Sequence, residues 1–398
     1  MLSFKYRVYP SKKQIFRLHG QMQLARELYN ILLEKCKEHY KETGKTFTQF
    51  DMNNYIKGLK KERPEFSDIH SQVLQNISKR IGDAYKAFFR RAKEKKQGKK
   101  VKVGFPRVRK FVSSLTYPQT GFKFKSQRRI YLSRIGSIPI VLHRLPKGQI
   151  KICVIKQYRS GKWYIGFSSD IPQKEFKPNN KPSIGVDVGL KDFVTLSDGE
   201  KIESPKFLRK SEKKLKFLQR RVSKKKNGSK NRRKACLKLS RQYEKIDNQR
   251  YDFLHKLSRQ HVGSYSKIAV EKLQIQNMQK NHYLAKSIAD ASFGKYIQML
   301  HYKAWSAGCE VIEVNPKNTT QECSNCHKIV EKDLSDRMHN CPSCGLSIDR
   351  DINAALNILN RATVGLTGSN ACGDLSSTPS AMKEQDISSK QELNEVRT

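Results

Sequence analysis

The first hundred residues show one strand-like pattern and two helix-like patterns. Hydrophobic and polar positions alternate over residues 2–9 and stop at Pro10, which is typical of a β-strand. An apolar stripe at helical spacing then predicts a helix from about 12 to 40, and a second stripe predicts another from about 70 to 96. We therefore expect a helical insertion over residues 11–100.

From residue 101 to 175 the pattern becomes that of short strands. Runs rich in Val, Ile, Tyr and Phe are separated by Gly and Pro, for example at 138–143, 149–158 and 162–169. Together with residues 1–10, these runs predict a small β-barrel into which the helices are inserted.

Buried strands and helices alternate in the second half of the chain. Residues 183–190 and 267–273 are apolar runs, and each contains an acid near its end, Asp187 in the first and Glu271 in the second. A helical stripe over 286–307 precedes a further short strand. A buried strand that ends in an acid tends to place that acid at the edge of a sheet, so we expect Asp187 and Glu271 at such an edge.

Two Cys-x-x-Cys pairs follow, and together they have the spacing of a metal site. Cys323 and Cys326 form the first pair, Cys341 and Cys344 form the second, and fourteen residues lie between the pairs. Four thiolates at this spacing suit one structural zinc ion in tetrahedral geometry. His327 and His339 lie near enough in sequence to compete as ligands, but four cysteines already complete the shell.

Asp351 is the third acid, because it stands at the start of an apolar, helix-like run seven residues after the last cysteine. Asp349 is its rival, two residues earlier. Carboxylates seldom occupy such sites without a partner, although each acid taken singly could also be a helix cap or a surface charge. If Asp187, Glu271 and Asp351 converge, their repulsion calls for a cation, and oxygen ligands favour Mg²⁺ or Mn²⁺. Two such ions about 4 Å apart would suit phosphodiester hydrolysis.

Charge indicates the kind of partner. The 398 residues contain 80 Lys plus Arg against 36 Asp plus Glu, which gives a net charge of +44. Residues 201–250 alone contain 20 basic and 4 acidic side chains, in a pattern of two helices. The excess is beyond the needs of solubility, so we expect a nucleic acid partner whose phosphates contact this basic hairpin.

Neither a signal peptide nor an apolar run of about 18 residues is found, and the other five cysteines are scattered. We therefore expect no membrane association and a reducing, intracellular location. From about residue 363 the sequence is rich in Gly, Ser and Thr, which predicts a flexible tail over 363–398.

Several of these segments together resemble the TnpB proteins of insertion sequences, which are similar to type V CRISPR effectors. The matching segments are SIGVDVGLKDFVTLSDG, KIAVEKL and CPSCGLSIDRDINAALNIL, which look like three RuvC motifs, with YRVYPSKKQ, GFPRVRKF and NPKNTTQECSNC elsewhere. The resemblance covers the chain to about residue 373. It implies an RNA-guided DNA endonuclease that cuts beside a short transposon-associated motif, with a guide RNA and target double-stranded DNA as partners.

The resemblance also implies roles and boundaries. Asp187, Glu271 and Asp351 would be the catalytic metal ligands of a prokaryotic enzyme of the cytoplasm or nucleoid, and the four cysteines would hold zinc. The implied fold is a multidomain mixture of α+β and α/β parts, the latter an RNase H-like RuvC domain. Its domains are a split wedge barrel (1–10 and 101–175), a helical recognition lobe (11–100), the RuvC domain (176–318 and 347–362), the zinc knuckle (319–346) and the tail (363–398).

Two other functions stay open. A nuclease-inactive, RNA-guided DNA-binding protein would be expected to have lost one of the three acids, and all three are present. A transposase, or a regulator of transposition, could use the same metal ligands, and joined DNA products would distinguish it.

Overall fold

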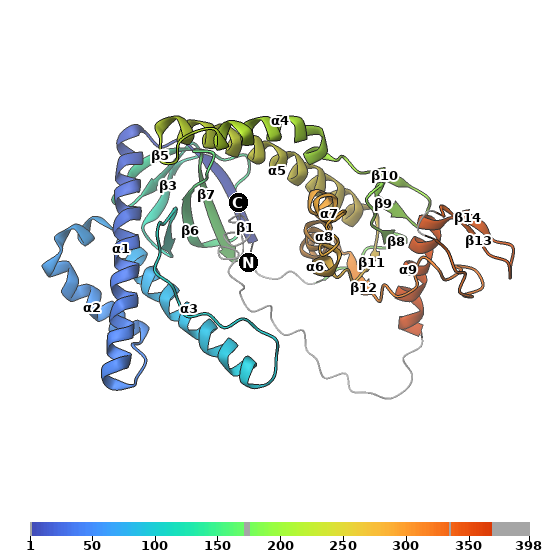
Figure 1. Cartoon of the computed structure of the whole chain (residues 1–398), viewed down its shortest axis with the longest axis horizontal. Coiled ribbons are helices and arrows are strands. Elements are labelled where there is room, and N and C mark those ends of the chain that lie inside the picture. Colours follow the sequence, from blue (N-terminus) through green and yellow to red (C-terminus); the bar gives the residue numbers. More distant parts are fainter. Residues whose placement is uncertain (1, 171–175, 334–335, 368–398) are drawn as a thin grey trace. The chain divides into compact units, whose positions relative to one another are not determined.

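The computed structural model describes residues 2–170, 176–333 and 336–367 (Figure 1). Residues 368–398, most of the expected tail, therefore lie outside the described part of the chain. The chain divides into two compact units. Unit 1 comprises Met1–Glu175 and Leu208–Gln249, and unit 2 comprises Phe176–Phe207 and Arg250–Thr398. The basic pair of helices, which we expected within 176–318, thus groups with unit 1 over Leu208–Gln249.

Unit 1 is built on a seven-stranded antiparallel sheet in the order β2-β6-β7-β1-β5-β4-β3. Its strands are β1 (Leu2–Val8), β2 (Ser114–Pro118), β3 (Phe122–Ser126), β4 (Arg129–Leu132), β5 (Gly136–Val141), β6 (Gln149–Gln157) and β7 (Trp163–Asp170). The first strand of the chain therefore lies in the middle of the sheet. The sheet curls, but its outer strands β2 and β3 are not paired with each other in the described structure, so the expected barrel is an open half-barrel.

Helices pack on this half-barrel and share its core. They are α1 (Lys12–Thr43), α2 (Gln49–Glu62), the 3-10 turn η1 (Pro64–Asp68) and α3 (Ser71–Lys96). Ser11 begins α1 with a capping box to Gln14, and Gly44 ends it in the left-handed region at φ 66°. The buried side chains of Leu18, Leu28 and Tyr6 belong to one continuous core.

The basic pair of helices, α4 (Phe207–Ser223) and α5 (Lys230–Ser264), lie side by side (Figure 1). Gln219 of α4 donates to the Tyr243 hydroxyl of α5 at 2.9 Å. Within unit 1, Glu244 of α5 accepts from the Tyr164 hydroxyl and pairs with Lys162, both at 2.8 Å. One of the few acids of the hairpin is thus used to attach it to β7.

Unit 2 contains a mixed five-stranded sheet in the order β10-β9-β8-β11-β12. Strands β8, β11 and β12 are parallel, while β9 and β10 are antiparallel to their neighbours. The strands are β8 (Ser183–Asp187), β9 (Asp192–Leu196), β10 (Lys201–Glu203), β11 (Lys267–Glu271) and β12 (Glu310–Val314). The strands predicted at 183–190 and 267–273 are confirmed, each ending at its acid.

The helices of unit 2 are α6 (Ile275–Met278), α7 (Ala285–Ala291), α8 (Phe293–Ala307) and α9 (Arg350–Thr367). The single helix expected over 286–307 is interrupted at Ser292, which adopts a left-handed φ of 58°. Helix α9 packs directly over β8 at Gly185, where an added Cβ would stand 1.9 Å from the carbonyl oxygen of Ala355. Only glycine permits this approach, so Gly185 sets how closely the helix that carries Asp351 lies to the strand that carries Asp187.

Candidate metal centres

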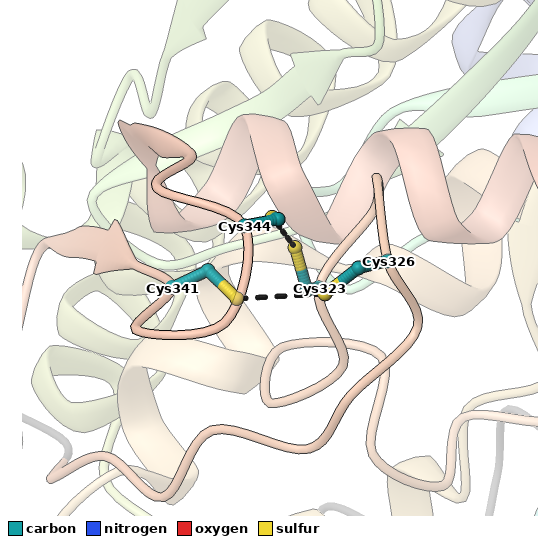
Figure 2. Close-up of side chains that lie close together, drawn as sticks. All are labelled: Cys323, Cys326, Cys341 and Cys344. Carbon is teal, nitrogen blue, oxygen red and sulfur yellow. Dashed lines mark hydrogen bonds between the residues drawn. The ribbon is translucent and has the colours of Figure 1, made fainter.

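The four cysteines of the two Cys-x-x-Cys pairs meet in one cluster (Figure 2). Their sulfur atoms all lie within 4.8 Å of one another, with Cys323 and Cys344 at 3.6 Å and Cys326 and Cys341 at 3.5 Å. A tetrahedral zinc shell with Zn–S bonds of 2.3 Å has sulfur atoms roughly 3.8 Å apart. The cluster therefore fits a metal ion such as zinc.

Two matching backbone turns build this cluster. In the first, the N–H of His327 donates to the Cys323 carbonyl at 3.0 Å, and in the second, the N–H of Gly345 donates to the Cys341 carbonyl at 2.9 Å. Both His327 and Gly345 adopt left-handed φ angles, 59° and 73°. The hairpin β13 (Met338–Asn340) and β14 (Ser347–Asp349) carries the second turn.

Electrostatics at the cluster favour a bound cation. The backbone N–H of Leu346 lowers the pKa of Cys344 to about 6. A backbone hydrogen bond at Lys328 lowers the pKa of Cys326, but burial and its cysteine neighbours raise it to about 11. Thiolates this close repel one another, so all four can ionise together only when a cation compensates them.

Neither histidine of the knuckle joins the sulfur cluster. The Nδ1 atom of His327 lies 3.0 Å from the Glu322 carboxylate, and the buried ring of His339 contacts the Lys332 ammonium. Among the described residues, the group with metal-ligand spacing consists of the four cysteines alone.

Two of the predicted acids lie at the ends of adjacent parallel strands. Val186 of β8 is paired with Val270 of β11, so Asp187 and Glu271 are the next residues in register. Both side chains are partly exposed, as is Asp351 in the first turn of α9. Among the described residues, the three acids are not part of the group that has metal-ligand spacing.

The charges of the three acids nevertheless act on one another. Burial, together with the charges of Glu271 and Asp351, raises the pKa of Asp187 to about 8, although the Val188 N–H and Arg350 oppose the shift. Burial also raises the pKa of Glu271. Like charges that raise a carboxyl pKa mark a position that a cation would stabilise.

Asp349 makes contacts that Asp351 does not make. Its Oδ1 accepts the backbone N–H groups of Asp351 at 3.0 Å and Ile352 at 3.3 Å, so it caps the N-terminus of α9. It also pairs with Lys201 at 2.6 Å. Burial favours its neutral form, but the Lys201 ammonium and these N–H groups outweigh burial and lower the pKa of Asp349. The contacts of the Asp349 carboxylate thus stabilise the N-terminus of α9.

The sequence analysis did not identify a polar stripe along α9 that supports both clusters. Asn353 and Asn357 are fully buried, and they donate to backbone carbonyls of the segment that leads into Cys323. Thr319 of that segment donates to the Glu271 carboxylate. The signal available in the sequence was the spacing of four between Asn353, Asn357 and Arg361 in an otherwise apolar helix.

These features define a mixed α/β protein with a sulfur metal cluster and a group of carboxylates in the same unit. Three family models match the chain: one described as "Probable transposase" over residues 167–282, one described as "Cas12f1-like, TNB domain" over 293–358, and one described as "Helix-turn-helix domain" over 1–45. The second of these ranges contains all four cysteines of the cluster.

Two relatives match this chain over nearly the whole length of both proteins. A Streptomyces pristinaespiralis protein named as an RNA-guided DNA endonuclease is 32% identical over 94% of this chain and 91% of its own. An Escherichia coli K12 protein named as the RNA-guided DNA endonuclease InsQ is 28% identical over 96% of both chains. The chain belongs to the TnpB family.

Among solved structures, the mini-RNA-guided endonuclease CRISPR-Cas_phi3 aligns over 92% of both chains with a TM-score of 0.49 and 11% identity. Within the residues that the structure describes, no helix combines the length and the apolar character that crossing a membrane requires.

Proposed function

We propose that this protein is an RNA-guided DNA endonuclease whose RuvC-type site consists of Asp187, Glu271 and Asp351. The observation that carries the proposal is the register of β8 and β11, in which Asp187 and Glu271 are neighbours on adjacent strands, together with the position of Asp351 in the first turn of α9, which packs on β8. The mixed sheet is consistent with the RNase H-like domain that the resemblance implies. The names of the full-length relatives support the same activity.

The two donor sets suit two different metals. Carboxylate oxygens favour Mg²⁺ or Mn²⁺, which when bound would activate water and stabilise the charge of a phosphodiester transition state. The chain's own acids would hold these ions, and their partial exposure leaves room for DNA. Thiolates favour zinc in a structural role, away from the reacting phosphate.

The basic helices supply the proposed contacts to nucleic acid. Sixteen or more charges of one sign on α4 and α5 would attract phosphates and make binding dependent on salt. Exposed examples are Arg209, Lys213, Arg221, Arg233, Lys238 and Lys245. In this assignment the half-barrel is the wedge domain, α1 to α3 form the recognition lobe, and the first 110 residues read the motif beside the target.

The test begins with expression of the protein together with its native flanking DNA. Any RNA that co-purifies is sequenced, and the complex is given Mg²⁺ and a plasmid that matches the RNA 3′ end beside randomised bases. We expect a discrete RNA and a double-strand cut that Asp187→Ala abolishes while RNA binding persists. Bound RNA without a cut would favour the nuclease-inactive DNA-binding protein. Absence of specific RNA would contradict both guided functions and lead to assays for the joined DNA of a transposase.

A further inference from the structure

The segment between β12 and the first cysteine pair is held along one face of α9. Asn353 donates to the Glu322 carbonyl at 2.7 Å, and Asn357 donates to the carbonyls of Thr319 at 3.0 Å and Glu322 at 2.7 Å. In return, the Ser324 N–H donates to the Asn353 side chain at 2.9 Å. These amides are buried, so each bond is difficult to replace with water.

Arg361 extends this attachment one turn further along α9. Its guanidinium donates to the carbonyls of Asn315 at 2.8 Å and Lys317 at 2.7 Å, and it pairs with the Glu322 carboxylate. The whole segment from residue 315 to 322 is therefore fixed to the helix that carries Asp351.

Thr319 faces in the other direction, toward the acids. Its side chain is only 3% exposed, and its hydroxyl donates to Oε1 of Glu271. One oxygen of the Glu271 carboxylate is held in this way, which leaves the other to face a cation. Glu271 has one more rotatable bond than either aspartate, so it gains more from a fixed partner.

We propose that Thr319 is a positioning residue for Glu271, and that α9 fixes Thr319 through Asn357. This inference rests on the proposed function, because it takes Glu271 as a catalytic metal ligand. The segment that enters the cysteine cluster thereby sets the orientation of the second acid. A partner that hydrogen-bonds a metal ligand typically changes metal affinity by about 10- to 100-fold when it is removed.

The experiment compares three variants in the RNA-bound protein. Thr319→Val keeps the shape and removes the hydroxyl, Thr319→Ser keeps the hydroxyl, and Thr320→Val is the matched control, since Thr320 is the exposed neighbour. Three quantities are measured: the Mn²⁺ concentration for half-maximal cleavage, Mn²⁺ affinity by calorimetry with an Asp187→Ala complex as the reference, and zinc content with thermal midpoint.

We expect Thr319→Val to need roughly 10-fold more Mn²⁺ in both metal assays, with zinc content unchanged. Thr319→Ser and Thr320→Val should have the same Mn²⁺ requirement and Mn²⁺ affinity as the wild type. An unchanged Mn²⁺ requirement in Thr319→Val, or a serine variant as defective as the valine variant, would overturn the inference. If Thr319→Val does not fold, Thr319→Ala is compared with Thr319→Ser by the same criteria.

Failure of the proposed function gives a different result. In that case the wild type would not cleave, and Asp187→Ala would bind Mn²⁺ as the wild type does. A wild type that cleaves, together with a Thr319→Val variant of unchanged Mn²⁺ dependence, would contradict only the role of Thr319.

Discussion

The cysteine cluster and the carboxylate cluster of unit 2 are assembled in opposite ways. The four sulfur atoms already stand at the spacing of a metal shell, because two short turns bring them together. The three carboxylates come from β8, β11 and α9, and they are not part of the group that has metal-ligand spacing among the described residues. Local turns thus preform the sulfur site, while tertiary packing only brings the oxygen site close enough for its charges to interact.

On our proposal, the difference follows from the separate roles of the two sites, one structural and one catalytic. A structural site can be closed, since nothing else needs to reach the ion. A catalytic site must admit a phosphate and a water molecule, and partly exposed acids suit that purpose. Four predictions sharpen this comparison: three concern one site or its support, and one concerns the stability of unit 2 apart from both sites.

The largest effect is expected at the start of α9. Asp351→Asn should lower the cleavage rate by more than about 10³-fold, roughly 4 kcal/mol, because a neutral amide is a poor ligand for Mg²⁺. Asp349→Asn should retain cleavage within a few-fold, since asparagine can also cap the helix. Cleavage rates of the two RNA-bound variants on one plasmid measure this. The reverse order would show that Asp349 is the metal ligand.

Loss of the sulfur site should act on stability first. Cys323→Ser should lower the free energy of unfolding of unit 2 by ~3 kcal/mol or more, because zinc binding contributes directly to folding. Thermal unfolding with zinc analysis measures this, and Cys236→Ser, a half-buried cysteine outside the cluster, is the control. A zinc-free Cys323→Ser variant of unchanged stability would refute a structural role for the cluster.

Acid should weaken unit 2 even with both metal sites set aside. His261 is buried beside the Tyr296 hydroxyl at 2.6 Å, and burial lowers its pKa to about 4, against the Asp198 charge. The unfolded state then binds more protons between pH 6.5 and 4. Stability is therefore lost as pH falls through that window, by about 2 kcal/mol from pH 7 to 5.

Denaturant unfolding at several pH values measures this loss, which His261→Gln should reduce. If the loss is equally large in His261→Gln, the pH dependence comes from the thiolates or carboxylates instead.

The smallest effect concerns the two turns of the sulfur site. His327→Gly should raise stability by ~0.5–1 kcal/mol, because a histidine at φ 59° is strained where glycine is not. Gly345→Ala should lower the stability by a similar amount, because alanine is strained at a φ of 73°. The cost should be no larger than that, because the added Cβ meets open space and clashes with nothing. The thermal midpoints of the zinc-loaded wild type and of the two zinc-loaded variants measure both effects. Should His327→Gly destabilise the protein instead, the bond from His327 to Glu322 outweighs the strain.

Local pattern predicted much of the fold. Alternation at residues 2–9 and the apolar runs at 183 and 267 are strands, and the stripes at 12 and 70 begin helices within a residue of the expected positions. The spacing of the cysteines alone also identified their cluster. Two cysteines three residues apart on one turn must have their sulfur atoms close together.

The helix α2 was not predicted, although Thr48 and Asp51 form a capping box ahead of Met52, Ile56 and Leu59. Its apolar stripe is too short to stand out among polar residues.

Contacts between distant segments could not be predicted from the pattern. The acids are 84 and 80 residues apart, so their proximity depends on strand register and on the close approach at Gly185. The hydroxyl of Thr319 on Glu271 depends on the same packing. The grouping of the basic hairpin with unit 1 depends on contacts such as that between Glu244 of α5 and Tyr164 of β7, and hydrophobic periodicity contains no information about them.

The packing of α9 over Gly185 has a consequence for the order in which the protein becomes functional during synthesis. Residues 208–249, with the basic face proposed to bind RNA, leave the ribosome more than a hundred residues before Asp351. Strand β8, which carries Asp187, lacks its contact with α9 at Gly185 until that helix has been synthesised. On our proposal, a nascent chain can therefore hold its guide before it is able to cut, and a message truncated ahead of α9 yields an RNA-binding protein without a nuclease.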